Sequence, residues 1–395
     1  MIKRKKKNKE HNPFYDPTLK KRHVSAKRFK KFTLTSLIFS VAFLAFFLFD
    51  MIGKGIPAFN IAYVKVDVTF NEKTLEDTRF AVPTEYRNLV SRAALRDLPK
   101  LLEENPTYMN STQNIWILAS SQVDQYIKNH NHNLKDKDIA IVDELYAQGL
   151  IEKRFNAIFF TNGDSKIPEY AGIFSAVIGS ILTLIITMAV AFPIGVMTAI
   201  YLEEFAGDNK FTRFIEININ NLAAIPSILF GLLGLAIFIN LFGMPRSSPL
   251  VGGLTLALMT LPIIIVSSRA ALRAVPDSIR QAGYGLGLNK IQVTRDHVLP
   301  LAFPGIMTGS IIGLAQAMGE TAPLIIIGMI AFIPDAPSMV TQAATVMPAQ
   351  LFTWAGMPEG MYIEKTAAGI LVLLTILISL NAIAIFLRKK FEVKW

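Results

Sequence analysis

The sequence predicts a mainly α-helical, polytopic membrane protein with six transmembrane helices and a small α/β extracytoplasmic domain. Hydrophobic residues make up 52% of the 395 residues. They gather in uninterrupted runs of about 20 residues, long enough for a helix to cross a hydrocarbon core of about 30 Å. After the first of these runs comes a stretch of about 110 residues with mixed charges and turns, which is enough for a modest soluble core. Cysteine is absent, so the chain carries no disulfide and no thiolate metal site.

Residues 1–31 form a basic tail, and residues 32–52 form the first apolar run. The tail holds thirteen lysines and arginines against Glu10 and Asp16. Such a tail attracts anionic lipid or nucleic acid, but beside a membrane span its usual effect is to keep the N-terminus in the cytoplasm. We therefore expect no nucleic-acid partner. The run ends without a small-residue cleavage site, so we expect a retained transmembrane anchor.

We interpret residues 57–169 as an extracytoplasmic α/β domain, because one span separates them from the cytoplasmic tail. Tyr63–Phe70 alternates apolar and polar residues as a strand does, and we expect another strand and an Asn-Gly turn within Phe155–Ser165. His130 and His132 have no third ligand at a suitable spacing. The sequence therefore predicts a solvated turn there and no metal site.

Five further spans are expected in residues 171–387. They are Gly172–Leu202, Phe214–Phe242, Leu250–Ser268, Phe303–Ile333 and Thr366–Leu387. With the anchor they make six, so both termini lie in the cytoplasm, and the basic C-terminal tail, 388–395, agrees with this topology. The first inner loop is an exception because Glu203 and Glu204 make it acidic, but acidic residues count little in the positive-inside rule.

The polar loop 269–303 lies between two of these spans. Its excess of basic residues places it in the cytoplasm. Ser278 and Gln281 have the spacing of a capping box at the start of a short helix. Closely spaced glycines then clear side chains from one patch: Gly283, Gly285 and Gly287. A folded loop with a bare surface predicts a docking element for another protein.

This loop resembles the EAA loop of ATP-binding-cassette importer permeases, in which Glu-Ala-Ala precedes a glycine and then Leu-Pro. The corresponding residues here are Gln281, Ala282, Gly283, Gly287, Leu299 and Pro300. The first is Gln instead of Glu, and the third is Gly instead of Ala. Four further motifs resemble the permease subunits of ATP-driven phosphate importers: Tyr201–Ala206, Ala223–Leu232, Arg273–Ala282 and Met318–Leu324.

The resemblance, which covers about Ala171 to the C-terminus, implies a type I importer permease fold in the bacterial cytoplasmic (inner) membrane. It implies transport of inorganic phosphate and three kinds of partner: a second permease, two copies of a cytoplasmic ATPase, and an extracytoplasmic phosphate-binding protein. The chain lacks G-x-x-x-x-G-K-[ST], so we expect no enzyme activity and no cofactor here, with ATP-Mg bound by the partner ATPase. Two alternatives remain: a permease for sulfate or molybdate, and a membrane-anchored ligand sensor.

Glu320 lies near the middle of the expected fourth inner span, where an ionisable residue marks either a pathway or a structural site. We expect the substrate path there, with three neutral neighbours: Thr321, Gln316 and Ser227. A carboxylate accepts hydrogen bonds from protonated phosphate, or it holds an arginine whose fork meets the anion. Related sequences often have an arginine at the position of Gln316. Arg269 and Arg273 lie near the membrane edge, so we expect an arginine from the second permease.

Overall fold

The computed structural model describes residues 18–330 and 332–391. These residues form two compact units, divided after Gly53. Residues 1–17 of the basic tail and residues 392–395 of the C-terminal tail lie outside the described residues. The first unit holds helix α1, Leu19–Gly55, except for its last two residues. This helix contains the expected anchor and extends it through the basic residues before it.

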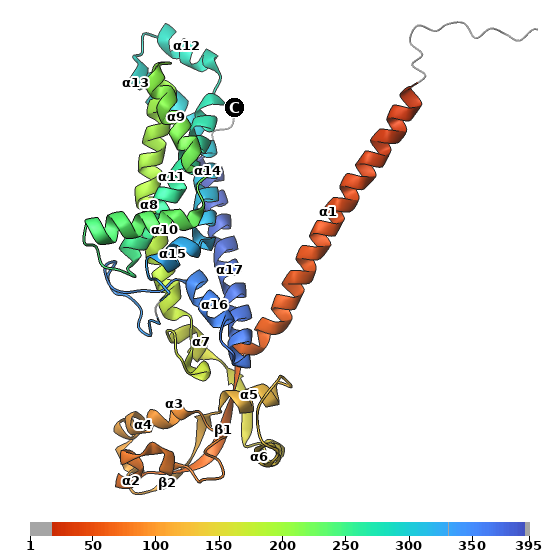
Figure 1. The fold of residues 1–395 in the computed structure, drawn as a ribbon, viewed down its shortest axis with the longest axis vertical. Helices are drawn as coiled ribbons and strands as arrows, with labels where there is room; N and C mark the ends of the chain where they lie inside the picture. Colours follow the sequence, from red (N-terminus) through yellow and green to blue (C-terminus); the bar gives the residue numbers. More distant parts are fainter. Residues whose placement is uncertain (1–17, 331, 392–395) are drawn as a thin grey trace, which may run out of the picture. The chain divides into compact units, whose positions relative to one another are not determined.

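The described residues contain five helices that are long and apolar enough to cross a membrane (Figure 1). These are α1, α8 (Phe174–Ile200), α11 (Pro249–Arg273), α14 (Leu299–Gly319) and α17 (Gly360–Phe391). A sixth candidate is a broken pair, α9 (Lys210–Leu222) followed by α10 (Ser227–Gly234) and η6 (Leu235–Leu241), with a bend of 105°. The mainly helical, polytopic fold class is confirmed, with five spans or six if the bent pair is one span.

Two expected spans are interrupted. The first is broken at Pro226, which has extended dihedral angles and precedes the first residue of α10. A residue before proline disfavours the helical conformation, so α9 ends shortly before it. The expected span Phe303–Ile333 is broken as well, because α14 ends at Gly319 and the short helix α15, Ala322–Ile326, follows.

In the second unit α8, α10 and α14 pack against α11. Small residues allow these close approaches: a Cβ added at Gly309 of α14 would lie 1.9 Å from Oγ of Ser267 in α11. Helix α17 lies beside α14 and beside α16, Met347–Ala355. Buried apolar side chains such as Leu256 and Ile306 fill the spaces between the helices.

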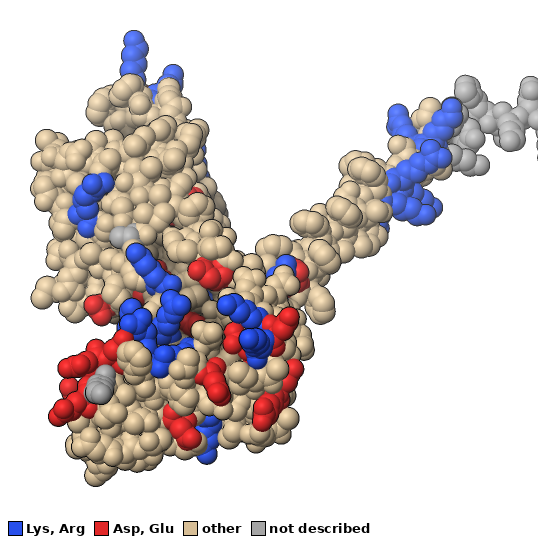
Figure 2. Space-filling model, turned by 60° about the horizontal axis from the view of Figure 1, so that its bottom comes forward, with Lys and Arg blue, Asp and Glu red and all other residues tan. Residues whose placement is uncertain are grey.

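The soluble domain contains a three-stranded antiparallel sheet in the order β2-β1-β3. Its strands are β1 (Asn60–Thr69), β2 (Thr112–Leu118) and β3 (Ile151–Phe155). Its helices are α2 (Glu72–Glu76), α3 (Arg92–Arg96), α4 (Leu98–Glu104), α5 (Ser121–Ile127) and α6 (Asp136–Ala147). Figure 2 shows basic and acidic side chains gathered on this domain, whereas the helices above it in that view carry few.

Sequence reasoning was correct for β1 and wrong for the stretch Phe155–Ser165. Phe155 ends β3, and the next residues form helix α7, Ala157–Thr161. The cause is Asn156, whose side chain accepts a hydrogen bond from the N–H of Phe159 and so caps the helix.

Buried polar contacts fasten the soluble domain to the first turns of α17. The Lys365 side chain is fully enclosed, and its Nζ donates to the carbonyl oxygens of Pro168 and Ala171 at 2.6 Å each. These carbonyls flank the turn η4, Pro168–Tyr170. The neighbouring residue Glu364 is also buried, and its carboxylate lies 3.1 Å from Nζ of Lys128.

The Glu364 carboxylate also accepts a hydrogen bond from Nε2 of Gln125 at 2.6 Å and contacts Nδ1 of His130. The His130 side chain is only 37% exposed. His130 is therefore part of this junction, which the sequence did not indicate, although Asn129 and Asn131 on either side of it are exposed as expected for a solvated turn. Burial raises the pKa of the Asp124 carboxyl, whose Oδ2 lies 2.6 Å from Nζ of Lys128.

Candidate functional site

The loop between α11 and α14 folds into two short helices and a wide turn. Helix α12 spans Asp277–Gly285, helix α13 spans Lys290–Val293, and the π-helical turn η7, Thr294–Val298, continues directly into α14. Figure 1 shows α12 and α13 at the end of the helices remote from the sheet. Any movement of this loop therefore acts directly on the start of α14.

Gly287 shapes the bend of the loop because its φ is +79°, in the left-handed region. Its N–H donates to the carbonyl of Tyr284 at 2.9 Å, and the N–H of Leu288 donates to that of Gly283 at 3.2 Å. This pair of bonds is a Schellman motif, which ends α12. A Cβ at Gly287 would meet nothing within 4 Å, so within this chain the turn alone requires the glycine.

A capping box follows the bend, but at a different place from the expected one. The side chains of Asn289 and Gln292 each accept a hydrogen bond from the other's backbone N–H at 2.9 Å, which starts α13. At the predicted position Pro276 is the N-cap of α12 and no side chain caps the helix, so the assignment to Ser278 and Gln281 is wrong. The proline excludes it because it fills the N-cap position and has no hydroxyl or amide side chain.

A groove of about 410 Å³ opens between α12 and the start of α14. It is lined by Ile279, Ala282, Gly283, Leu286, Asp296, His297, Pro300 and Leu301. A Cβ at Gly283 would lie 2.8 Å from Cγ2 of Val293, so this glycine allows α12 to lie close to α13. A second hollow of about 380 Å³ shares Ile279 and Leu301 with the groove.

The structure brings three of the predicted coupling residues together in this groove: Ala282, Gly283 and Pro300. Gln281 is exposed outside it, and Leu299 packs partly buried against the core below it. Beside the groove, the side chain of Leu286 is 78% exposed. An apolar side chain at the rim of an apolar hollow is typical of a surface that binds another protein.

Three arginines of the 269–303 loop form ion pairs with Glu203 and Glu204, the acidic residues of the first inner loop. Nη2 of Arg280 lies 2.6 Å from Oε1 of Glu204 in η5, Tyr201–Phe205. Nε of Arg273 lies 2.7 Å from Oε1 of Glu203. Nε of Arg269 lies 3.3 Å from Oε2 of the same Glu203. The negative charges of Glu203 and Glu204 are thus neutralised by neighbouring arginines.

Sequence reasoning missed this network, although the unusual acidity of the inner loop was a visible signal for it. Arg269 and Arg273 are engaged with Glu203, and Arg269 also contacts Glu216 of α9. Neither arginine is paired with Glu320.

Glu320 and Thr321 lie in the break between α14 and α15. Glu320 is the C-cap of α14 with an extended ψ of 123°, and Thr321 precedes the first residue of α15. Both side chains are half-buried, as is Ser227, whereas Gln316 is exposed. Over the described residues, no hydrogen bond or ion pair reaches the Glu320 carboxylate.

Two of the sequence motifs meet beside this break. Helix α10 packs on α15, and a Cβ at Gly231 would lie 2.7 Å from Cα of Pro323. Broken helices of this kind occur at membrane depth where they line a cavity or are buried in protein. Ser227 begins α10, but no hydrogen bond joins it to Glu320 within the described part of the chain.

Comparisons with known proteins identify the family of the chain. Residues 191–393 match the family described as binding-protein-dependent transport system inner membrane component. The chain belongs to this family. Residues 16–86 and 81–136 match a domain of unknown function, DUF3333, which covers the anchor and part of the soluble domain.

Relatives place the chain among PstA-type permeases of the family. The phosphate transport system permease protein PstA of Yersinia pestis is 31% identical over 55% of this chain and 74% of that protein. PstA of Mycobacterium leprae (strain TN) is 36% identical over 40% of this chain and 52% of that protein. The probable ABC transporter permease protein YqgI of Bacillus subtilis (strain 168) is 34% identical over 42% of this chain and 56% of that protein. The chain spans about half the length of the first curated relatives it matches.

Among solved structures, the MetNI methionine ABC transporter in an inward-facing conformation matches 56% of this chain and 98% of that chain. The identity is 16% and the TM-score is 0.45.

Proposed function

We propose that this PstA-type permease is a subunit of an ATP-driven importer of inorganic phosphate in the bacterial inner membrane, with both termini in the cytoplasm. Its partners would be a second permease, two copies of a cytoplasmic ATPase and an extracytoplasmic phosphate-binding protein. The names of the PstA relatives support the substrate. The observation that carries the proposal is the loop groove, which opens at one end of α14, while the Glu320 break lies at the other.

In this proposal the ATPase docks in the groove at Ala282, Gly283 and Pro300. The chain runs without interruption from η7 into α14, so a push on the loop moves the whole helix. The ion pair between Arg280 and Glu204 carries the same movement to the end of α8. Rocking of the two permeases between outward and inward states would then open the path on alternate sides.

Glu320 and Thr321 are the proposed substrate-path residues, with Gln316 and Ser227 as neutral neighbours. A carboxylate accepts hydrogen bonds from the protonated oxygens of phosphate, whereas sulfate carries no proton near neutral pH. Glu320 is unpaired within the described chain, which leaves it available to such a ligand or to an arginine of the second permease. A sulfate or molybdate permease and a ligand sensor are the alternatives.

Uptake of radiolabelled phosphate by membrane vesicles tests the proposal. Vesicles that contain this chain and its partners should accumulate phosphate when supplied with internal ATP, and vesicles without the chain should not. Excess sulfate or molybdate should leave uptake unchanged. If either anion competes and is itself accumulated, the permease is specific for another oxyanion. If ligand changes signalling but nothing accumulates, the chain is a sensor.

A further inference from the structure

The outer edge of β2 is paired only at its end, where Val90 forms a bridge with Ala119 and the N–H of Ser91 donates to the carbonyl of Leu118 at 2.8 Å. Strand β2 pairs with β1 along one edge only, with Lys65 opposite Trp116. The N–H of Lys65 donates to the carbonyl of Leu150 on the β3 side, so the Lys65–Trp116 pair is a non-hydrogen-bonded one. The N–H and C=O of Trp116 therefore point away from β1. Among the described residues, no hydrogen bond satisfies them.

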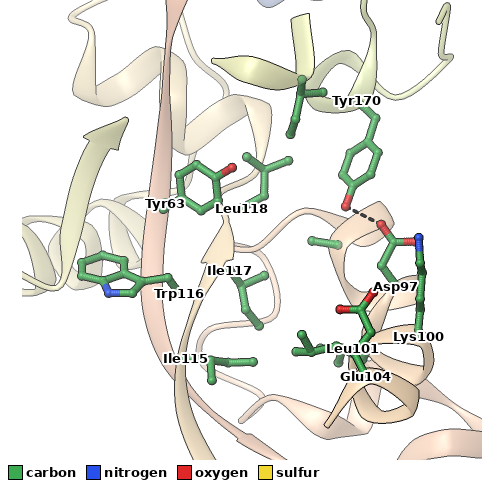
Figure 3. A pocket seen from close by; sticks show the side chains of 13 residues that line it. Tyr63, Asp97, Lys100, Leu101, Glu104, Ile115, Trp116, Ile117, Leu118 and Tyr170 are labelled. Atoms are coloured by element: carbon green, nitrogen blue, oxygen red, sulfur yellow. Dashed lines mark hydrogen bonds between the residues drawn. The ribbon is translucent and has the colours of Figure 1, made fainter. Parts of the chain in front are cut away.

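A cavity of about 330 Å³ runs along this free edge (Figure 3). Four consecutive residues of β2, from Ile115 to Leu118, line it, together with side chains of α3 and α4. Ile115 and Ile117 point toward Leu101 of α4, whereas Trp116 lies on the other side of the strand. Consecutive strand residues point to alternate faces, so only a cavity beside the backbone edge can touch all four.

The far wall of the cavity is acidic. Asp97 and Glu104 line it with Lys100 between them, so carboxylates outnumber amines. Glu104 and Lys100 form no ion pair with any described residue. A partner that lies along β2 would therefore gain from a lysine or arginine directed at this wall.

The cavity also adjoins the junction with the membrane helices. The hydroxyl of Tyr170 donates to Oδ2 of Asp97 at 2.6 Å across the upper end of the cavity. Tyr170 is the last residue of the turn η4. The carbonyls of Pro168 in this turn and of Ala171 after it accept hydrogen bonds from Lys365 of α17. An occupant of the cavity would thus contact Asp97 and Tyr170, and the turn that contains Tyr170 is bonded directly to α17.

We propose that this groove receives an extended segment of the extracytoplasmic substrate-binding protein, which adds to β2 as a fourth strand. Backbone hydrogen bonds to Trp116 would supply affinity, and a basic side chain directed at Asp97 and Glu104 would set the register. The proposal rests on the proposed function, because a binding-protein-dependent permease must engage such a partner. It assigns that partner to one particular edge of the soluble domain.

A matched pair of charge reversals tests the groove in the assembled transporter. Glu103 and Glu104 are adjacent, exposed residues in the last turn of α4, but only Glu104 lines the cavity. Glu104→Lys should weaken binding of the purified phosphate-binding protein roughly tenfold or more, because the new lysine would repel the basic side chain of the binding protein. Glu103→Lys should leave the affinity unchanged. Equal affinities of the two variants would overturn the proposal.

Amide hydrogen exchange gives a second measurement that does not depend on substitution. Addition of the binding protein should slow exchange of the Trp116 amide, which would become part of a new ladder. The matched amide is that of Lys153 in β3. The backbone groups of the even-numbered residues Leu150 and Asn156 bond on the β1 side, so the N–H of the odd-numbered Lys153 points to the outer edge of β3. Its exchange should not change. Unchanged exchange at Trp116 contradicts the proposal.

The experiments distinguish failure of this groove proposal from failure of the proposed transport function. If vesicles import phosphate but neither Glu104→Lys nor the Trp116 amide responds to the binding protein, docking at this groove is wrong and the transport function stands. If the wild-type transporter neither imports phosphate nor binds the phosphate-binding protein, the proposed function is wrong and the groove proposal falls with it.

Discussion

Oε1 of Glu204 lies 2.6 Å from Nη2 of Arg280, and both side chains are largely buried, at 5% and 16% exposure. The same guanidinium donates to the carbonyls of Leu272 and Val275 at the end of α11, at 3.0 and 2.8 Å. One side chain therefore joins α12 to the ends of two membrane helices. Its hydrogen bond to Glu204 raises the pKa of Arg280 above its usual value, so it stays charged.

Arg280→Lys should uncouple the loop from the helices. Lysine keeps the charge but cannot reach the carboxylate and both carbonyls with one planar fork. We expect a loss of about 1.5–3 kcal/mol of stability, the range for a lost hydrogen bond that involves a charged group, and weaker stimulation of ATP hydrolysis. Thermal unfolding in detergent and ATPase assays measure both effects. As a control, Arg295→Lys affects an exposed pair with Asp296 and should leave stability unchanged. Equal effects of the two substitutions would contradict this role.

Gly287→Ala and Gly285→Ala should have opposite effects on stability. Neither new methyl group meets an atom within 4 Å, but only Gly287 has a positive φ. Alanine at 287 should cost about 1–2 kcal/mol through left-handed strain, whereas alanine at 285 should gain up to about 1 kcal/mol in helix α12. Thermal unfolding of the two variants measures the difference. If both destabilise equally, the Schellman turn is not what requires the glycine.

Glu320→Gln should reduce phosphate uptake sharply while the protein still folds. The amide conserves volume and most hydrogen bonding, but it removes the charge that accepts from protonated phosphate or holds a partner arginine. Vesicle uptake and thermal unfolding are measured together, with exposed Asp335→Asn as the control. Normal uptake with reduced thermal stability would falsify the assignment of Glu320 to the substrate path.

Asp164 gives the soluble domain a pH dependence. Its carboxylate accepts from Nε1 of Trp354 at 2.8 Å, and burial raises its pKa. The native state then binds a proton more readily than the unfolded state, so this contribution to stability is complete below about pH 4 and is lost as the pH rises.

Asp164→Asn removes this titration and keeps an oxygen for Trp354. The variant should therefore gain stability relative to the wild type as the pH rises from 5 to 8, as followed by thermal unfolding. Exposed Asp335→Asn should give a curve parallel to that of the wild type. Parallel curves for Asp164→Asn would show that its carboxyl titrates normally.

The features that the sequence predicted are those determined by residues close together in the chain. Apolar runs are a one-dimensional signal, so α8, α11 and α17 were found close to their observed bounds. The break after Gly319 is marked in the sequence by Glu320 and Pro323, but a proline alone does not locate a break, because Pro262 lies inside the continuous helix α11. Ala282, Gly283 and Pro300, which line one groove, could be singled out from the sequence because one short segment holds them.

Contacts between distant segments could not be found in this way. Lys365 binds carbonyls 194 and 197 positions earlier in the chain, and Glu364 binds Gln125 across 239 positions. Nothing in the residues next to either charge indicates a buried partner. The same holds for the free edge of β2, because strand order depends on pairing between segments and not on the pattern within one.

The first and last residues of the sheet, Asn60 and Phe155, lie opposite each other in the β1–β3 pair. The chain thus enters the sheet at Asn60 and leaves it at Phe155, two residues that lie side by side. This strand pair therefore fixes the separation of the two connections, so the domain cannot move on one of them without moving the other.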